Sequence, residues 1–167
     1  MSISDGATMT VAANLVDGAS GPTLQKVGGS GTGIVAVKIG TADAAVDMTS
    51  ISSSGAASTT FTVFETIDNF TGTLATTTGV AAGATLNLTA AKATGKTITG
   101  AGSGSVNVTA LDQTLDADVS AITAATGSGA TLTGTYLTSG SGDFIGNFGT
   151  AGMTVNISDG ATMTVAA

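Results

Sequence analysis

The chain contains an internal repeat, and this repeat restricts its fold more than any other feature. The eleven residues ISDGATMTVAA at 3–13 recur without change at 157–167. Midway between them, residues 80–91 read VAAGATLNLTAA, which keeps the GAT core and the apolar positions around it. Three evenly spaced copies indicate a repeat of about 77 residues, in which each unit buries its apolar face against the next.

Similarity between the two units continues through their interiors. The matching segments are GSGTGIVAV (29–37) with GAGSGSVNV (100–108), AVDMTSI (45–51) with DADVSAI (116–122), and FTGTL (70–74) with FIGNF (144–148). The first two pairs are closer together than the copies of the strand–turn element, which indicates an insertion in the first unit near ASGPTL. The sequence therefore predicts a first unit at 1–79, a second at 80–156, and the first strand and turn of a third at 157–167.

The identity between the first and last copies is closer than the similarity between either of them and the middle copy. We interpret it as a recent duplication that followed an older one, and an engineered terminal copy is the alternative. In both cases we expect residues 1–167 to be a window from a longer array.

Within the units, apolar residues alternate with Thr, Ser and Asn, which is typical of strands with one buried face. The apolar positions with the clearest alternation are Met9, Val11, Leu86, Leu88, Val106, Val108, Met153, Val155 and Ile157. Glycine pairs bound these short runs and permit tight corners. No stretch keeps a convincing helical spacing, so we expect almost no helix.

Two all-β architectures fit short strands of this kind. A β-solenoid stacks one coil on the next around a thin aliphatic core, whereas a string of β-sandwich modules needs about seven longer strands per unit. The unit is small for a sandwich, only 4% of the residues are aromatic, and no linker separates the units. We therefore predict a parallel β-helix-like solenoid, with about four coils of about 19 residues per unit, and keep tandem sandwiches as the alternative.

The composition argues against several classes of function. The chain has no Cys and no His, which removes thiol nucleophiles, Ser-His-Asp triads and the usual zinc ligands. Its net charge of −7, with only four basic residues, is unsuited to nucleic acid. Solenoid hydrolases with paired carboxylates also need aromatic and basic groups for sugars, which are scarce here. We expect no enzymatic activity, no resident cofactor and no membrane insertion, since no apolar run of about 18 residues occurs.

Five aspartates are the candidate metal ligands. They are Asp43, Asp47, Asp112, Asp116 and Asp118. Carboxylates combined with loop carbonyls bind Ca²⁺. However, the EF-hand spacing is absent, and neither GGSGTGI nor SGSGDF completes the GGxGxD pattern of calcium-binding β-rolls. We favour solvated acids in turns and keep Ca²⁺ as the alternative.

Threonine triplets are a second candidate feature. TMT occurs at 8–10 and 162–164, TFT at 60–62, TIT at 97–99 and TLT at 131–133. Flat ice-binding faces need such triplets on successive coils, and the spacing here is irregular. Ordinary strand alternation explains the triplets, with ice or mineral binding as the minor alternative.

Two long segments carry a resemblance to a known group. KTITGAGSGSVNVTALDQTLDADVSAI and FIGNFGTAGMTVNISDGATMTVAA resemble the tandem β-strand repeats of very large secreted bacterial surface proteins, which include S-layer-like and adhesin-type repeat proteins. The resemblance covers nearly the whole chain and identifies no functional residue. It implies a non-catalytic role as a rod, fibre or layer, outside the cell or at the bacterial surface.

An open solenoid end presents unpaired strand edges, so the expected partner is the chain itself or an adjacent repeat, joined end to end. The alternative is an adhesive or ligand-binding module, with or without Ca²⁺, that uses the outward Thr, Asn and Ser surface.

Overall fold

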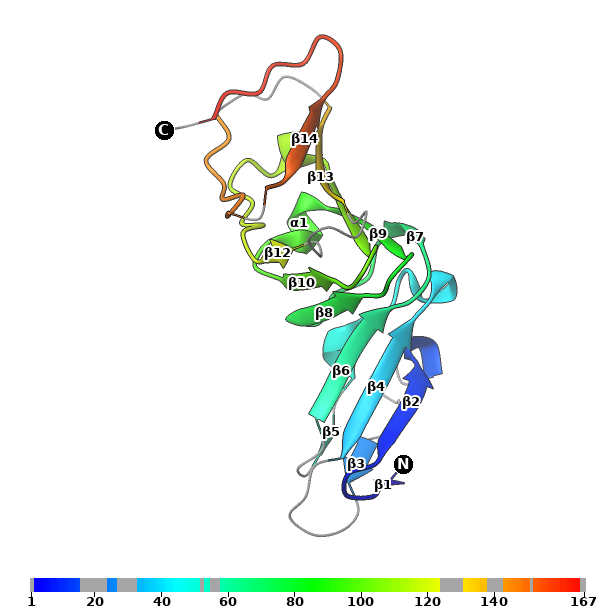
Figure 1. The fold of residues 1–167 in the computed structure, drawn as a ribbon. Helices are drawn as coiled ribbons and strands as arrows, with labels where there is room; N and C mark the ends of the chain where they lie inside the picture. The colour runs from blue at the N-terminus through cyan, green and yellow to red at the C-terminus, as the bar shows by residue number, and fades with distance from the viewer. Residues whose placement is uncertain are drawn as a thin grey trace.

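The structure is a computed structural model that describes residues 2–15, 24–26, 33–51, 53–54, 58–123, 131–137, 143–150 and 152–165. The chain winds as a β-solenoid of about five turns, with its termini at opposite ends of an elongated molecule (Figure 1). Every strand pair among these residues is parallel. The predicted solenoid is confirmed, and the sandwich alternative is wrong because sandwich modules need antiparallel strands.

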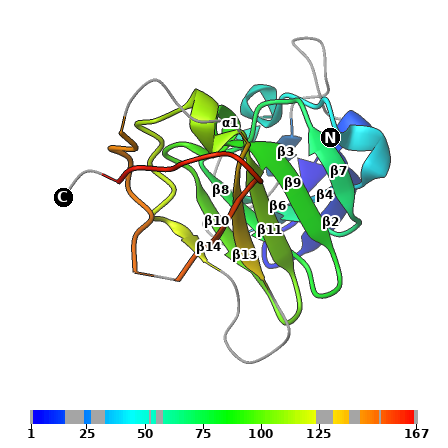
Figure 2. The ribbon, with the colours of Figure 1, turned by 90° about the horizontal axis from the view of Figure 1, so that it is seen from above.

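Three walls surround the core. The first sheet contains β2 (Thr8–Ala12), β4 (Ile34–Ile39), β6 (Ser58–Val63), β8 (Thr77–Val80), β10 (Thr97–Gly100) and β12 (Ile122–Thr123). The second sheet contains β7 (Ile67–Phe70), β9 (Thr85–Thr89), β11 (Ser105–Thr109), β13 (Leu132–Tyr136) and β14 (Thr154–Ile157), which lie side by side in Figure 2. The third side holds β1 (Ser2–Ile3), β3 (Leu24–Lys26) and β5 (Ser53–Ser54), and farther along the isolated bridges Asp47↔Thr73, Asp118↔Asn147 and Phe144↔Val165.

Helical structure in the described residues is limited to single turns, as expected. These turns are η1 (Ala13–Leu15), η2 (Thr41–Asp43), η3 (Met48–Ser50), α1 (Ala90–Ala93) and η4 (Leu111–Gln113). Four of these five turns begin within two residues of the end of a strand, so they turn the chain from one wall to the next.

The core forms where the alternating apolar residues of successive coils stack. Leu86 pairs in register with Val106, and Leu88 with Val108, and all four side chains are buried. The predicted inward direction is therefore confirmed in the middle coils. Ile157 pairs in register with the buried Tyr136 but is itself 49% exposed, because β14 is the edge strand of its sheet.

The sequence repeat does not correspond to a whole number of coils. In the first sheet, paired positions differ by 26 between β2 and β4, by 24 between β4 and β6, and by 17 between β6 and β8. In the second sheet the steps are 20 from β9 to β11, 26 from β11 to β13 and 21 from β13 to β14. Three coils therefore fall ten positions short of one repeat in both sheets. The expected four coils of about 19 residues are wrong.

The ten residues that remain in each repeat carry the chain on to the next wall. The first copy of the strand–turn element joins β1 on the third side to β2 in the first sheet. The middle copy joins β8 in the first sheet to β9 in the second. The last copy leaves β14 in the second sheet and reaches Val165, which is bridged to Phe144 on the third side. Each repeat therefore begins one wall farther around the three-walled solenoid than the repeat before it.

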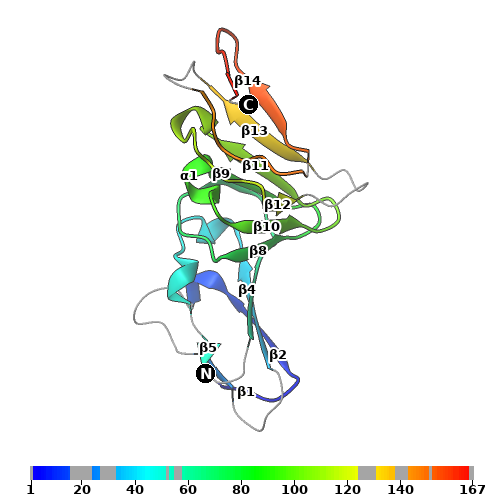
Figure 3. The same ribbon diagram turned by 90° about the vertical axis from the view of Figure 1, so that its left-hand side faces the viewer.

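The first sheet twists sharply in its middle. β6 and β8 are joined only through Thr62↔Gly79 and Val63↔Val80, whereas β4 and β6 are paired along the whole of both strands. In Figures 1 and 3, β2, β4 and β6 run steeply along the molecule, while β8 and β10 run across it. The unpaired half of β6 forms one wall of a cleft.

Candidate functional site

Asp43 is a structural residue that links two coils. Its side chain is only 5% exposed. One carboxylate oxygen accepts the Gly40 N–H at 2.8 Å, and the other accepts the Asn14 N–H from the preceding coil at 3.0 Å. Because both oxygens already serve backbone donors, the geometry favours a structural role for this carboxylate over metal binding.

Asp47 and Asp118 occupy equivalent places in the two units, as the match of AVDMTSI with DADVSAI predicts. Asp47 accepts the N–H of Thr49 at 2.9 Å and its hydroxyl at 2.6 Å. Asp118 accepts the N–H of Ser120 at 3.1 Å and its hydroxyl at 2.6 Å. Both aspartates lie at a bridge on the third side, so each shapes the turn that follows its bridge, which leads to β5 after Asp47 and to β12 after Asp118.

The Ser120 hydroxyl and, to a lesser degree, the Ser120 amide hold the pKa of the Asp118 carboxyl below its ordinary value. Because the pKa is lowered in the folded state, the stabilisation is present above the pKa of the unfolded chain. It is lost as the pH falls through the folded value. The carboxyl is fully exposed, so the surrounding water screens this contribution.

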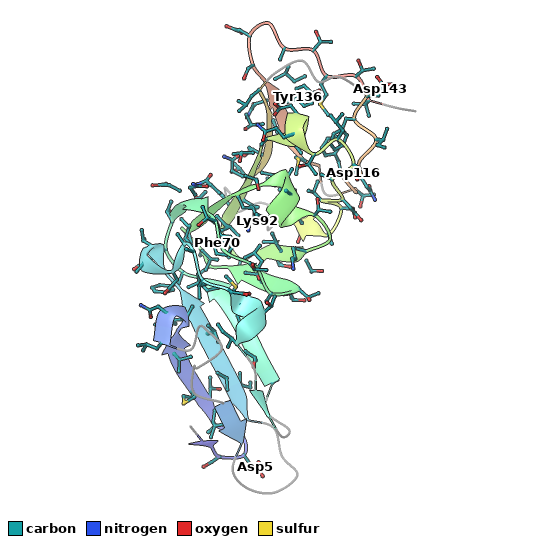
Figure 4. All side chains as sticks on the ribbon, turned by 180° about the vertical axis from the view of Figure 1, so that it is seen from behind. Asp5, Phe70, Lys92, Asp116, Tyr136 and Asp143 are labelled. Carbon is teal, nitrogen blue, oxygen red and sulfur yellow. The ribbon has the colours of Figure 1, made fainter. Side chains whose placement is uncertain are left out.

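The two remaining candidates precede Asp118 along the chain. Asp112 accepts the Leu137 N–H of the next coil at 3.3 Å, and Asp116 is exposed. Figure 4 shows Asp116 far from Asp5, which lies near the opposite end. In the part of the chain that the structure describes, no group of three or more metal-ligating side chains comes together. The five predicted residues are therefore not gathered into one group of ligands.

Replacing Asp43 with Ala is expected to lower the free energy of unfolding by about 2–3 kcal/mol, because two backbone donors lose a charged acceptor. Urea unfolding followed by circular dichroism measures this. Asp68→Ala is the matched control, since Asp68 is exposed on β7, and it should change stability by less than about 0.5 kcal/mol.

Thermal melts of the wild type in EGTA and in CaCl₂ should overlap. A large calcium shift that Asp43→Ala abolishes would show that this carboxylate binds the ion.

A polar ladder runs along the outside of the second sheet. The Asn107 amide donates to Asn87 Oδ1 at 3.0 Å and accepts from the Thr133 hydroxyl at 2.8 Å. The Asn87 amide in turn donates to the Ile67 carbonyl at 3.1 Å. These side chains are half-buried, and their hydrogen bonds fix them in a row on the outside of the sheet. Sequence reasoning missed it, although Asn at the centre of both TLNLT and SVNVT was an available signal.

The threonine triplets do not form a continuous row. The triplets at 8–10, 60–62 and 97–99 lie on β2, β6 and β10, which alternate with other strands in the first sheet. The triplet at 131–133 belongs to the second sheet, and the one at 162–164 lies outside the strands. Successive coils therefore do not present matching TxT units, which disfavours an ice-binding face.

The C-terminal end of the solenoid is apolar. Seven large apolar side chains are exposed in the described residues, and four belong to its last coils: Leu137, Ile145, Ile157 and Val165. Figure 4 places the buried Tyr136 at this end, opposite Asp5. An apolar end that follows edge strands is typical of a surface on which another coil stacks.

The cleft at the twist of the first sheet has a volume of about 400 Å³. Its lining includes Met48, Thr49, Thr59, Phe61, Thr76 and Thr77. The Thr59 hydroxyl is buried and makes no hydrogen bond. The residues that line the cleft carry no charge, and the polar side chains among them are threonines.

None of the helices in the described residues is long and apolar enough to cross a membrane. Comparisons with known protein families, with curated proteins and with solved structures give no match.

Proposed function

We propose that the chain is a non-catalytic structural repeat segment of an exported bacterial surface protein, and that it forms rods, fibres or layers by end-to-end stacking. The observation that carries this proposal is the open solenoid end. β2 is the edge strand of the first sheet at one end, and β14 is the edge strand of the second sheet at the other. Edge strands with free backbone groups pair readily with another chain.

The repeat geometry supports the same role. Successive repeats continue the coil without a linker and advance by one wall, so stacked units extend one solenoid. The last coils also expose apolar side chains near the free edge, including Ile145 at 67% exposed and Leu137 at 48%. Burial of these side chains in a contact between copies favours association. A location outside the cell or at its surface belongs to this proposal and rests on the resemblance of the repeats.

Sedimentation velocity over a wide concentration range tests the stacking. We expect the wild type to associate, and Ile145→Lys and Leu137→Lys to weaken the association about tenfold or more, because each places a charge in the apolar end. Thr99→Lys is the matched control, since Thr99 is exposed on the outer face of β10, and it should leave association unchanged. Association that all three variants weaken alike would contradict stacking at the end. Electron microscopy then distinguishes rods from sheets.

An adhesive or ligand-binding module is the second candidate, and the ladder of Asn87, Asn107 and Thr133 favours it. Half-buried amides fixed by hydrogen bonds offer donors and acceptors in a preorganised row. A glycan and surface-binding screen separates the two functions, because a scaffold should bind only its own copies.

A further inference from the structure

The two ends of the chain carry the same eleven residues in different surroundings. We propose that residues 157–165 occupy the position that residues 3–11 of a second copy take in an end-to-end assembly. In the single chain the C-terminal copy covers this place, and in the assembly the N-terminal coil of a neighbour displaces it. The inference rests on the proposed stacking function and names the surface that is used.

The two segments adopt the same turn although they lie on different walls. The Ala7 N–H donates to the Ser4 carbonyl at 3.1 Å, and the Ala161 N–H donates to the Ser158 carbonyl at 2.9 Å. Gly6 and Gly160 have φ values of +69° and +78°. Because sequence and turn geometry agree, either segment fits a site shaped for the other.

The backbone of the C-terminal copy makes several of the contacts that hold this segment. The Ser158 N–H donates to the Tyr136 carbonyl at 3.0 Å, and the Thr164 carbonyl accepts the Phe144 N–H at 2.7 Å. Ile157 is paired with Tyr136 in the register of β13 and β14. The same bonds are open to the matching residues of a second copy, Ser4 and Thr10.

The middle copy shows what an occupied site looks like within one chain. The Ala81 N–H, which corresponds to that of Ser4, donates to the Val63 carbonyl of the preceding coil at 2.8 Å. β1, which leads into Ser4, is an edge strand. The C-terminal end of a neighbouring chain therefore offers residues 3–11 the contacts to a preceding coil that the middle copy makes within its own chain.

Contacts with the coil that follows make binding of the second copy more favourable than binding of residues 157–165. Ile3 is 5% exposed, because Gly33 of the next coil packs closely over it: a Cβ on Gly33 would lie 3.1 Å from Ile3 Cγ2. Val80 is likewise buried, with Gly104 packed against its carbonyl. Ile157 remains 49% exposed. Residues 3–11 of a second copy bring with them the coil that covers Ile3. The exchange therefore keeps the contacts to the preceding coil and places a buried Ile3 where Ile157 is half-exposed.

The two turn glycines allow a matched test in the full chain. A Cβ at either Gly6 or Gly160 would meet nothing within 4 Å, so the main expected effect of Val at each position is strain at the positive φ. Gly160→Val should loosen the segment that covers the site and tighten self-association about tenfold. Gly6→Val should weaken association about tenfold, and the double variant should associate less than Gly160→Val alone. Sedimentation equilibrium measures all four proteins, and circular dichroism checks their folding.

A labelled peptide ISDGATMTVAA provides a second measurement that does not depend on the folding of Gly6→Val. We expect fluorescence anisotropy to show tighter binding of this peptide to Gly160→Val than to the wild type, and no binding of a scrambled peptide. Equal peptide binding by both proteins, or no gain in association by Gly160→Val, overturns the exchange. If Ile145→Lys still blocks association in that case, stacking stands and only the exchange fails. If no protein associates at any concentration, both fail.

Discussion

Replacing Gly72 with Ala is expected to lower the free energy of unfolding by about 3 kcal/mol or more, because the added methyl group has no space. A Cβ at this position would overlap the Val46 carbonyl oxygen, and would lie 2.8 Å from the Ala45 carbonyl carbon and 2.9 Å from Phe70 Cζ. Two of these contacts are backbone atoms of the preceding coil, so relief requires the coils to separate. Urea unfolding followed by circular dichroism measures the loss.

The second unit repeats this close approach at the matching place. A Cβ at Gly146 would overlap the Ala117 carbonyl oxygen and lie 2.9 Å from the Ala117 nitrogen. Gly146→Ala should therefore also be strongly destabilising. Gly79→Ala is the control, because its nearest neighbour is the Phe61 carbonyl at 3.6 Å, and it should change stability by less than about 0.5 kcal/mol. Equal stability of the Gly72 and Gly79 variants would contradict the tight stacking of the coils.

The fold class was predictable because it depends on local patterns. Alternation at Leu86 and Leu88 identifies a strand with one buried face, and the repeated strand–turn element indicates stacking. The matching of FTGTL with FIGNF correctly aligned Gly72 with Gly146, which make equivalent contacts. These features are read from neighbouring residues or from identity between units, so they require no knowledge of the coil register.

The phase of the coils was not predictable in the same way. The steps between paired strands are unequal, because corners of different length connect the walls: Thr62 pairs with Gly79, whereas Thr8 pairs with the more distant Ile34. The sequence repeat has a constant length, whereas the coils within it differ in length, so the repeat does not reveal where each coil begins. The advance by one wall per repeat follows only when the registers of two sheets are compared.

The candidate site was predicted less well than the fold. Asp43 looked like an acid in a turn, but it is buried and accepts a bond from Asn14, 29 residues away. The ladder of Asn87 and Asn107 depends on their pairing across 20 residues. Composition cannot show which residues meet on adjacent coils. Only those contacts distinguish a carboxylate with a structural role from one that is exposed to solvent.

Two phenylalanines in matching positions provide the second large effect. Phe70 and Phe144 are both fully buried, and Phe144 also stacks on Phe148 with ring centroids 4.5 Å apart. Each change to Ala should cost about 3–5 kcal/mol of local packing. Phe70→Ala should lower the melting temperature by about 10 °C, because Phe70 lies in a central coil with coils on both sides.

Phe144→Ala should act differently, because it lies in one of the last coils. In a solenoid each coil contacts only its neighbours, so this coil unfolds without the middle of the molecule. Hydrogen exchange with mass spectrometry should show lost protection within residues 132–165 and unchanged protection within 77–109. Phe64→Ala is the control for both variants, since Phe64 is 40% exposed and its loss should cost less than about 1 kcal/mol. Equal loss of protection along the whole chain in Phe144→Ala would mean that the coils unfold as one cooperative unit.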